Sequence, residues 1–182
     1  MDKILILLVC CTLILSACEE KKEEPRSKAS VSLSSEILGT NIYYVNGFSF
    51  EEDEYISSLN TTGSIPDIIP QNILKPDQEV VGLALSAGPG NNYGFYKNFE
   101  SENFSEAEEF YENYLEAEAV NFSSLSDTIR VGQVYTFRTY KDNYVKFLVE
   151  DVRKYPGLYP EGYVEADIRF NIQRNGSDVF DQ

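Results

Sequence analysis

The sequence predicts a mainly β domain, an antiparallel sheet or sandwich, with one packed amphipathic helix near residues 105–119. The runs 41–50 and 79–87 are rich in β-branched and aromatic residues and are bounded by turn residues, which is typical of strands. Residues 133–152 indicate a β-hairpin, and residues 163–173 alternate strictly between apolar and polar side chains. Together these patterns favour an antiparallel sheet with one solvated face.

The N-terminal segment predicts an export signal. Its apolar run, residues 4–15, is shorter than the roughly 20 residues that a membrane-spanning helix needs. The tetrad Leu15-Ser16-Ala17-Cys18 resembles the lipobox of bacterial lipoproteins. This resemblance implies that residues 1–17 are a signal peptide cleaved between Ala17 and Cys18, and that lipid on Cys18 attaches the chain to a membrane. The alternative is an ordinary secretory signal with an incidental cysteine.

The predicted processing leaves few catalytic groups. Cys10 and Cys11 would leave with the signal, as would Met1, and the chain contains neither His nor Trp. With Cys18 lipidated, the mature chain would lack thiol nucleophiles, imidazole bases and the commonest zinc ligands. We therefore expect a non-enzymatic protein without a cofactor.

Composition divides the remaining chain into a tether and a single domain. Residues 18–36 are charged and then Ser-rich, with no aromatic residue, so we expect a flexible tether. Residues 37–182 have the length of one β-rich domain. Within it, three prolines between residues 57 and 78 predict a long irregular connection. Asp142-Asn143 is suited to the positive φ of a tight hairpin turn.

The predicted helix has a polar start, an apolar stripe and an acidic face. Ser105 with Glu108 matches a capping box. The stripe, which should pack on a sheet face, consists of Ala107, Phe110, Tyr111, Tyr114 and Leu115. Glu108, Glu112 and Glu116 follow one another at i, i+4 spacing, and each such like-charge pair costs about 0.2–0.5 kcal/mol. The helix sequence contains no lysine that could offset this repulsion.

The net charge of −15 is concentrated in the first half of the domain. Between residues 30 and 129 there are seventeen acids but only two bases, Lys75 and Lys97. The simplest interpretation is a solvated face that keeps the protein soluble. The sharper hypothesis is an interaction face, formed by Glu108, Glu112 and Glu116, for a basic protein partner or divalent cations. Nucleic acid is excluded as a partner, because a polyanion would be repelled.

Two further acidic motifs are candidate sites. The four adjacent acids 51–54 lack the spacing of a calcium-binding loop, so we expect a solvated turn. Glu165 and Asp167 share one face of the alternating strand, as paired catalytic carboxylates would. They also flank Arg169, and a cross-strand salt-bridge ladder that includes Lys146 is the alternative that we favour.

The thirteen tyrosines raise the possibility of sugar binding, because their amphipathic rings can stack on pyranose faces. The best candidate for an exposed aromatic loop is residues 155–163, "YPGLYPEGY". The alternative, which we prefer at this stage, is that these tyrosines only complete a turn and cover a sheet edge.

The segments "VGQVYTFRTYKDNYVKFLVEDV" and "YVEADIRFNIQRNG" resemble the ending of small surface lipoproteins of Bacteroidetes-type bacteria, including HmuY-type haem-binding lipoproteins. "NGFSFEED" and "PDIIP" resemble the opening of that group. The resemblance implies a β-rich domain at the outer membrane or cell surface. It does not carry haem binding, because the mature chain would lack the paired His or Met ligands; Tyr could ligate ferric haem, but no motif selects one.

We therefore expect an outer-membrane or cell-surface lipoprotein that acts as a non-enzymatic binding or accessory module. Three alternatives remain open. The first is a capture protein for haem or another small ligand with HmuY-like architecture. The second is a carboxylate-dependent glycan-acting enzyme that would use Glu165 and Asp167. The third is a protein-binding or inhibitor role for the acidic face of the helix.

Overall fold

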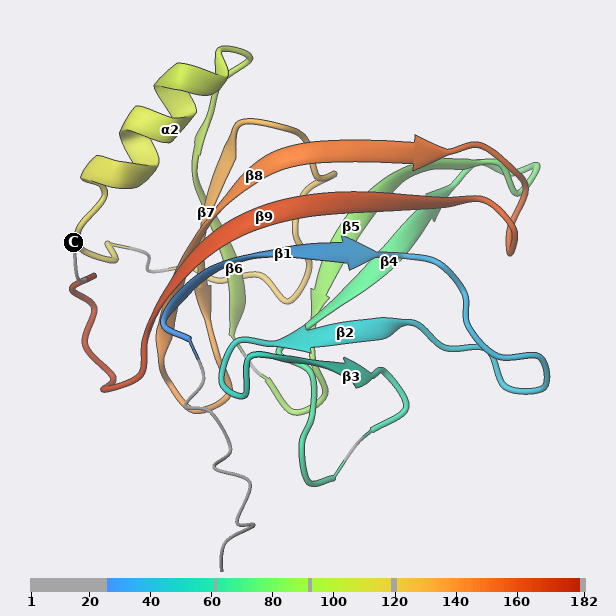
Figure 1. Ribbon diagram of the computed structural model, residues 1–182, viewed down its shortest axis with the longest axis horizontal. Coiled ribbons are helices and arrows are strands. Elements are labelled where there is room, and N and C mark those ends of the chain that lie inside the picture. Colours follow the sequence, from blue (N-terminus) through green and yellow to red (C-terminus); the bar gives the residue numbers. More distant parts are fainter. Residues whose placement is uncertain (1–25, 61, 92, 119–120, 181–182) are drawn as a thin grey trace, which may run out of the picture.

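The fold consists of two packed antiparallel β-sheets (Figure 1). The structure is a computed structural model that describes residues 26–60, 62–91, 93–118 and 121–180. The five-stranded sheet has the order β1-β9-β8-β7-β6, and the four-stranded sheet has the order β3-β2-β4-β5. The strands are β1 Lys28–Ser34, β2 Asn46–Ser49, β3 Glu54–Ser57, β4 Ile68–Leu74, β5 Val80–Ala87, β6 Gly94–Glu100, β7 Gln133–Arg138, β8 Tyr144–Tyr155 and β9 Tyr163–Gln173. The helix α2 spans Phe104–Asn113. This architecture confirms the predicted mainly β sandwich with one packed helix.

Aromatic side chains from both sheets fill the core. Phe50, directly after β2, contacts Phe170 of β9 at 5.1 Å and Phe137 of β7 at 5.7 Å between ring centroids. The alternation predicted for β9 is confirmed, since its five apolar residues Val164, Ala166, Ile168, Phe170 and Ile172 are all buried. A one-residue slip of this strand would expose the whole apolar set, so the alternation fixes its register.

The β7–β8 hairpin is also confirmed. Asp142 adopts a φ of 63° in its turn, as the sequence predicts. The neighbouring Asn143 is buried and donates hydrogen bonds to the carboxylate of Glu51. The turn is therefore fixed both by its backbone conformation and by a side chain from the turn between β2 and β3.

The prediction of a flexible tether over the whole of residues 18–36 is wrong, because Lys28–Ser34 form strand β1. This strand pairs antiparallel with β9, from Lys28 opposite Asn171 to Ser34 opposite Glu165. Its alternation is short, but Val31 and Leu33 are enough to place one face in the core. The domain therefore begins before residue 37, and residues 18–25 lie outside the described residues.

The predicted irregular connection between residues 57 and 78 contains strand β4. It pairs with β5 from Ile68 to Leu74, but among the described strands it pairs with β2 only at Ile68. Pro70 is tolerated because this part of β4 has only one neighbouring strand, where a missing N–H disrupts least. The edge of β4 from Ile69 onward is consequently open.

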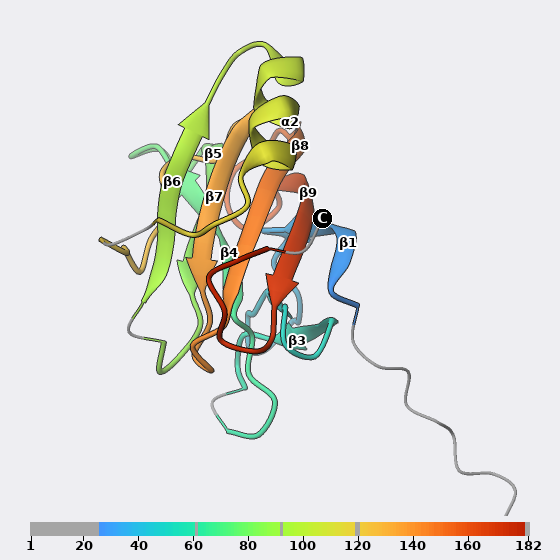
Figure 2. The same ribbon diagram turned by 90° about the vertical axis from the view of Figure 1, so that its left-hand side faces the viewer.

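Helix α2 packs on the outer face of the five-stranded sheet, as predicted, but it is shorter than residues 105–119. Figure 2 shows the helix lying against this sheet. Its buried residues Ala107 and Tyr111 belong to one hydrophobic cluster with Val134 of β7 and Leu148 of β8. Its N-cap is Asn103 rather than Ser105, since the Asn103 side chain accepts the Ser105 N–H at 3.2 Å. No helix among the described residues has the length and apolar character needed to cross a bilayer.

Candidate functional site

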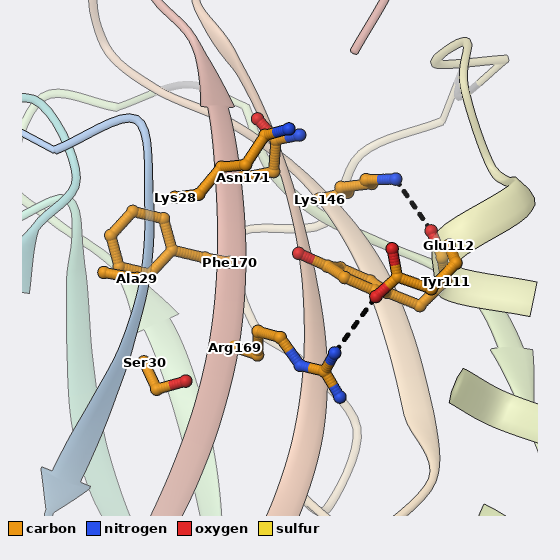
Figure 3. Close-up of a pocket in the computed structure, with 9 residues that line it drawn as sticks. All are labelled: Lys28, Ala29, Ser30, Tyr111, Glu112, Lys146, Arg169, Phe170 and Asn171. Atoms are coloured by element: carbon orange, nitrogen blue, oxygen red, sulfur yellow. Dashed lines mark hydrogen bonds and ion pairs between the residues drawn. The ribbon is translucent and has the colours of Figure 1, made fainter. Parts of the chain in front are cut away.

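A cleft of about 500 Å³ opens between helix α2 and the outer face of strands β1, β9 and β8 (Figure 3). We call it the α2 cleft. Sheet register builds its floor, because Lys28 of β1 lies opposite Asn171 of β9, which lies opposite Lys146 of β8. Alternation sends these three side chains to the same face, so an amide is flanked by two ammonium groups. The next row along the sheet contributes Ser30 and Arg169.

Lys146 terminates the helix. Its ammonium group donates to the carbonyl oxygens of Tyr111 at 2.7 Å and Tyr114 at 2.8 Å, and it lies 4.6 Å from the centroid of the Tyr111 ring. A cation is favourable here, because the last carbonyls of a helix carry partial negative charge. This contact accounts for the end of α2 at Asn113, which the sequence pattern does not predict.

The charge of Lys146 is buried without a carboxylate at ion-pair distance among the described residues. Burial lowers the pKa of Lys146; the carboxylate of Glu112 opposes this shift, and the positive charge of Lys28 adds to it. The two lysines therefore repel each other across Asn171. An anion placed between them would relieve that repulsion.

Arg169 joins α2 to the sheet by binding two glutamates of the predicted acidic face, Glu108 and Glu112. Its guanidinium binds Glu108 at 2.6 Å, Glu112 at 3.0 Å and Glu150 at 2.7 Å. Burial acts to lower the pKa of Arg169, but the hydrogen bonds to Glu108 and Glu150 raise it overall. The expectation that the helix glutamates repel each other without compensation is therefore wrong, because their cation comes from a distant strand.

Glu116 does not lie on the helical face that carries Glu108 and Glu112. It follows the end of α2 and forms an isolated antiparallel bridge with Val179. Helical i, i+4 spacing therefore does not apply between Glu112 and Glu116. The structure brings Glu108 and Glu112 together through Arg169 and leaves Glu116 exposed elsewhere.

Glu165 and Asp167 lie on the outer face of β9, and Arg153 binds both of them. The Arg153 guanidinium donates to Glu165 at 3.4 Å and to Asp167 at 2.8 Å. The hydrogen bonds from Arg153 to Asp167 lower the pKa of Asp167, against the opposing effect of burial. The prediction of a cross-strand salt bridge at Glu165 and Asp167 is confirmed. The prediction that Lys146 takes part in it is wrong, because the cation is Arg153. Neither carboxylate lines the α2 cleft.

The prediction of a solvated turn at residues 51–54 is wrong for its first residue, because Glu51 is buried. Thr139 donates to the Glu51 carboxylate at 2.5 Å. Nearby Asp67 is fully buried and accepts hydrogen bonds from Ser49 at 3.1 Å and from the Glu51 N–H at 3.2 Å. Burial, together with the charge of Glu51, raises the pKa of Asp67 to about 7.

Sequence patterns missed this buried pair, since Glu51 and Asp67 are separated by residues that resemble a surface loop. A partial signal was the position of Glu51 directly after the apolar strand. No group of three or more Asp, Glu, His or Cys side chains suited to a metal ion occurs in the described part of the chain. The predicted cleavage and lipidation residues, Ala17 and Cys18, lie outside the described residues.

Comparison with protein-family models, with curated proteins and with solved structures gives no match for this chain. The resemblance to lipoproteins at residues 15–18 and in the last third of the chain therefore stays a prediction.

Proposed function

We propose that the protein is a lipid-anchored surface lipoprotein that acts as a non-enzymatic binding module and holds a small anionic molecule in the α2 cleft. The anchor would be lipid on Cys18, at the outer membrane or cell surface. Support for this location comes from the lipobox-like tetrad 15–18. The α2 cleft provides the argument for binding.

The observation that carries the proposal is the pair of ammonium groups that flank Asn171. The charged residues lining the α2 cleft are Lys28, Lys146, Arg169 and Glu112. Arg169 is already paired with glutamates, so the two lysines are the cations that could bind an anion. A buried cation without an opposite charge is costly, and an anionic ligand would offset that cost. The volume is also within the usual range for small-molecule sites.

The rest of the surface restricts the ligand to a compact anion. A small carboxylate or phosphate can enter the α2 cleft without approaching the acidic residues elsewhere. An extended polyanion would meet those acids and be repelled. The proposal therefore agrees with the exclusion of nucleic acid.

Calorimetric titration of the mature chain with galacturonate, citrate and inorganic phosphate tests the proposal, with neutral galactose as the comparison ligand. We expect at least one of the three anions to bind and galactose not to bind at the α2 cleft. Lys28→Ala should weaken anion binding about tenfold, because Lys28 is exposed and its loss removes one of the two ammonium groups. Lys75→Ala removes the same charge from an exposed turn and is the matched control.

Absence of binding by all three anions would contradict the proposal. Equal losses in the Lys28→Ala and Lys75→Ala variants would also contradict it, because they would indicate a general effect of net charge.

A further inference from the structure

A second cleft, of about 380 Å³, lies at the end of the sandwich away from α2. It is bounded by the loop of residues 35–45, by strand β4 and by the β8–β9 loop (Figure 1). We call it the tyrosine cleft, because Tyr43, Tyr44 and Tyr159 line it. It shares no lining residue with the α2 cleft.

The tyrosine cleft is electrically neutral. A quarter of the chain is charged, yet none of the described residues that line this cleft carries a charge. Its polar groups are hydroxyls and side-chain amides, from Ser35, Ser58, Gln71 and Asn72. Charged ligands would lose hydration here without gaining an ion pair, so the lining selects an uncharged one.

The three tyrosines come from two separate loops and are accessible. Tyr43 is 58% exposed and Tyr159 is 37% exposed, while Tyr44 is partly buried. None of their hydroxyl groups forms a hydrogen bond within the described residues. Each therefore presents an apolar ring together with an available polar group, the combination that suits carbohydrate faces.

One wall of the tyrosine cleft is polar and rigid. The Ser35 hydroxyl donates to the Asn72 Oδ1 at 2.5 Å, and the Asn72 Nδ2 donates to the Ser35 carbonyl at 3.1 Å. This double contact ties the end of β1 to β4 and fixes the wall before any ligand binds. Between Ile69 and Leu74 the open edge of β4 adds main-chain donors and acceptors.

We propose that the tyrosine cleft binds a short neutral oligosaccharide. Rings of Tyr43 and Tyr159 would stack on sugar faces, and the amides and the open edge of β4 would bind sugar hydroxyls. An extended peptide could also add to a strand edge, but it would need continuous main-chain pairing along β4. Pro70 lacks an N–H, and the Ser35–Asn72 contact crosses this edge, so the edge offers separate polar groups rather than a continuous ladder. The proposal is independent of the anion site.

An array of neutral oligosaccharides, built from hexoses and N-acetylhexosamines, tests this inference with the mature chain. We expect binding to a subset of these glycans, followed by calorimetry of the best one. Tyr159→Ala and Tyr43→Ala should each weaken it about tenfold, whereas Tyr159→Phe should retain most of the affinity. Tyr140→Ala, in the β7–β8 turn at the other end of β8, is the matched control and should bind normally.

Both tyrosines are exposed, so their variants should fold, and unchanged thermal unfolding would verify this. The inference is overturned if no neutral glycan binds, or if the Tyr43 and Tyr159 variants bind like Tyr140→Ala. Binding of an extended-peptide library in place of glycans would overturn it in favour of strand addition at β4. Loss of glycan binding in Lys28→Ala would place the ligand in the α2 cleft and would equally overturn it.

Discussion

The α2 cleft and the tyrosine cleft are similar in size, about 500 and 380 Å³, but they are built from opposite chemistry. The α2 cleft is made of charged groups on regular elements, where sheet register aligns Lys28, Asn171 and Lys146. The tyrosine cleft is made of neutral groups that are mostly carried by loops. The difference teaches that this acidic chain keeps charge out of one cleft and places two lysines without a carboxylate partner among the described residues in the other. Changes that act on charged groups near one cleft should therefore affect ligand binding in the two clefts differently.

A change of pH should affect both clefts together, through the stability of the whole domain. Asp67 has a pKa of about 7 in the folded chain, above its usual value of 3.8. Between these pH values the folded chain holds a proton that the unfolded chain has released. Stability should therefore fall as pH rises from about 4 to about 7, by up to about 4 kcal/mol from this group.

Urea unfolding at several pH values measures this effect as the difference between the natural chain and Asp67→Asn. The stability of Asp67→Asn should not decline over this pH range, so this variant should be more stable than the natural chain at pH 8. Asp77→Asn, on an exposed turn, should keep the natural profile. Parallel profiles for Asp67→Asn and the natural chain would show that Asp67 does not take up this proton.

Removal of Arg169 should affect ligand binding in the α2 cleft but not in the tyrosine cleft. Arg169→Ala leaves Glu108, Glu112 and Glu150 close together without their shared cation, so we expect a loss of about 2–3 kcal/mol in unfolding free energy. The α2 cleft should lose its ligand while the tyrosine cleft keeps its own. Arg130→Ala is the control, because its exposed ion pair with Glu100 should contribute less than about 1 kcal/mol. Equal losses in the two variants would refute the linking role of Arg169.

The sequence predicted the elements that depend on local patterns. The alternation of β9, the positive φ of Asp142 and the packing of α2 on a sheet face all follow from residue spacing. Strand β1 was missed because Lys28–Ser34 has a polar composition, and only pairing with β9 makes its two inward residues sufficient. The end of α2 was missed because Lys146, which terminates it, lies on β8.

The candidate site was the least predictable part, since it depends on register between distant strands. At the far end of β8, Tyr155 lies opposite Tyr163 of β9, and this register places Arg153 opposite Glu165. A register shift between Val149 and Asp151 then changes the pairing by one residue, so that Lys146 lies opposite Asn171. Spacing within one strand cannot reveal which cation faces which carboxylate. The row Lys28, Asn171 and Lys146 has no counterpart in any local motif.

Added salt should weaken ligand binding in the α2 cleft but not in the tyrosine cleft. Raising sodium chloride from about 0.05 M to about 0.5 M shortens the distance over which exposed charges act. Binding of an anion in the α2 cleft should weaken severalfold, because Lys28 is exposed to solvent. Binding of a neutral oligosaccharide should stay constant. Calorimetry of both ligands at the two salt concentrations measures this, and a parallel fall in both affinities would mean that the clefts do not differ in their dependence on charge.

The smallest expected effect is the change in unfolding free energy on substitution of Glu116, which belongs to the predicted acidic interaction face. Glu116 is outside the Arg169 network, so Glu116→Lys should leave unfolding free energy within about 0.5 kcal/mol of the natural chain. Glu108→Lys should instead lower it, because it breaks a contact with Arg169 at 2.6 Å and places two cations together. If a basic protein partner binds this surface, Glu116→Lys should weaken its capture on the immobilised mature chain without a change in stability. Undiminished capture of such a partner by a stable Glu116→Lys variant would limit the role of Glu116 to solubility.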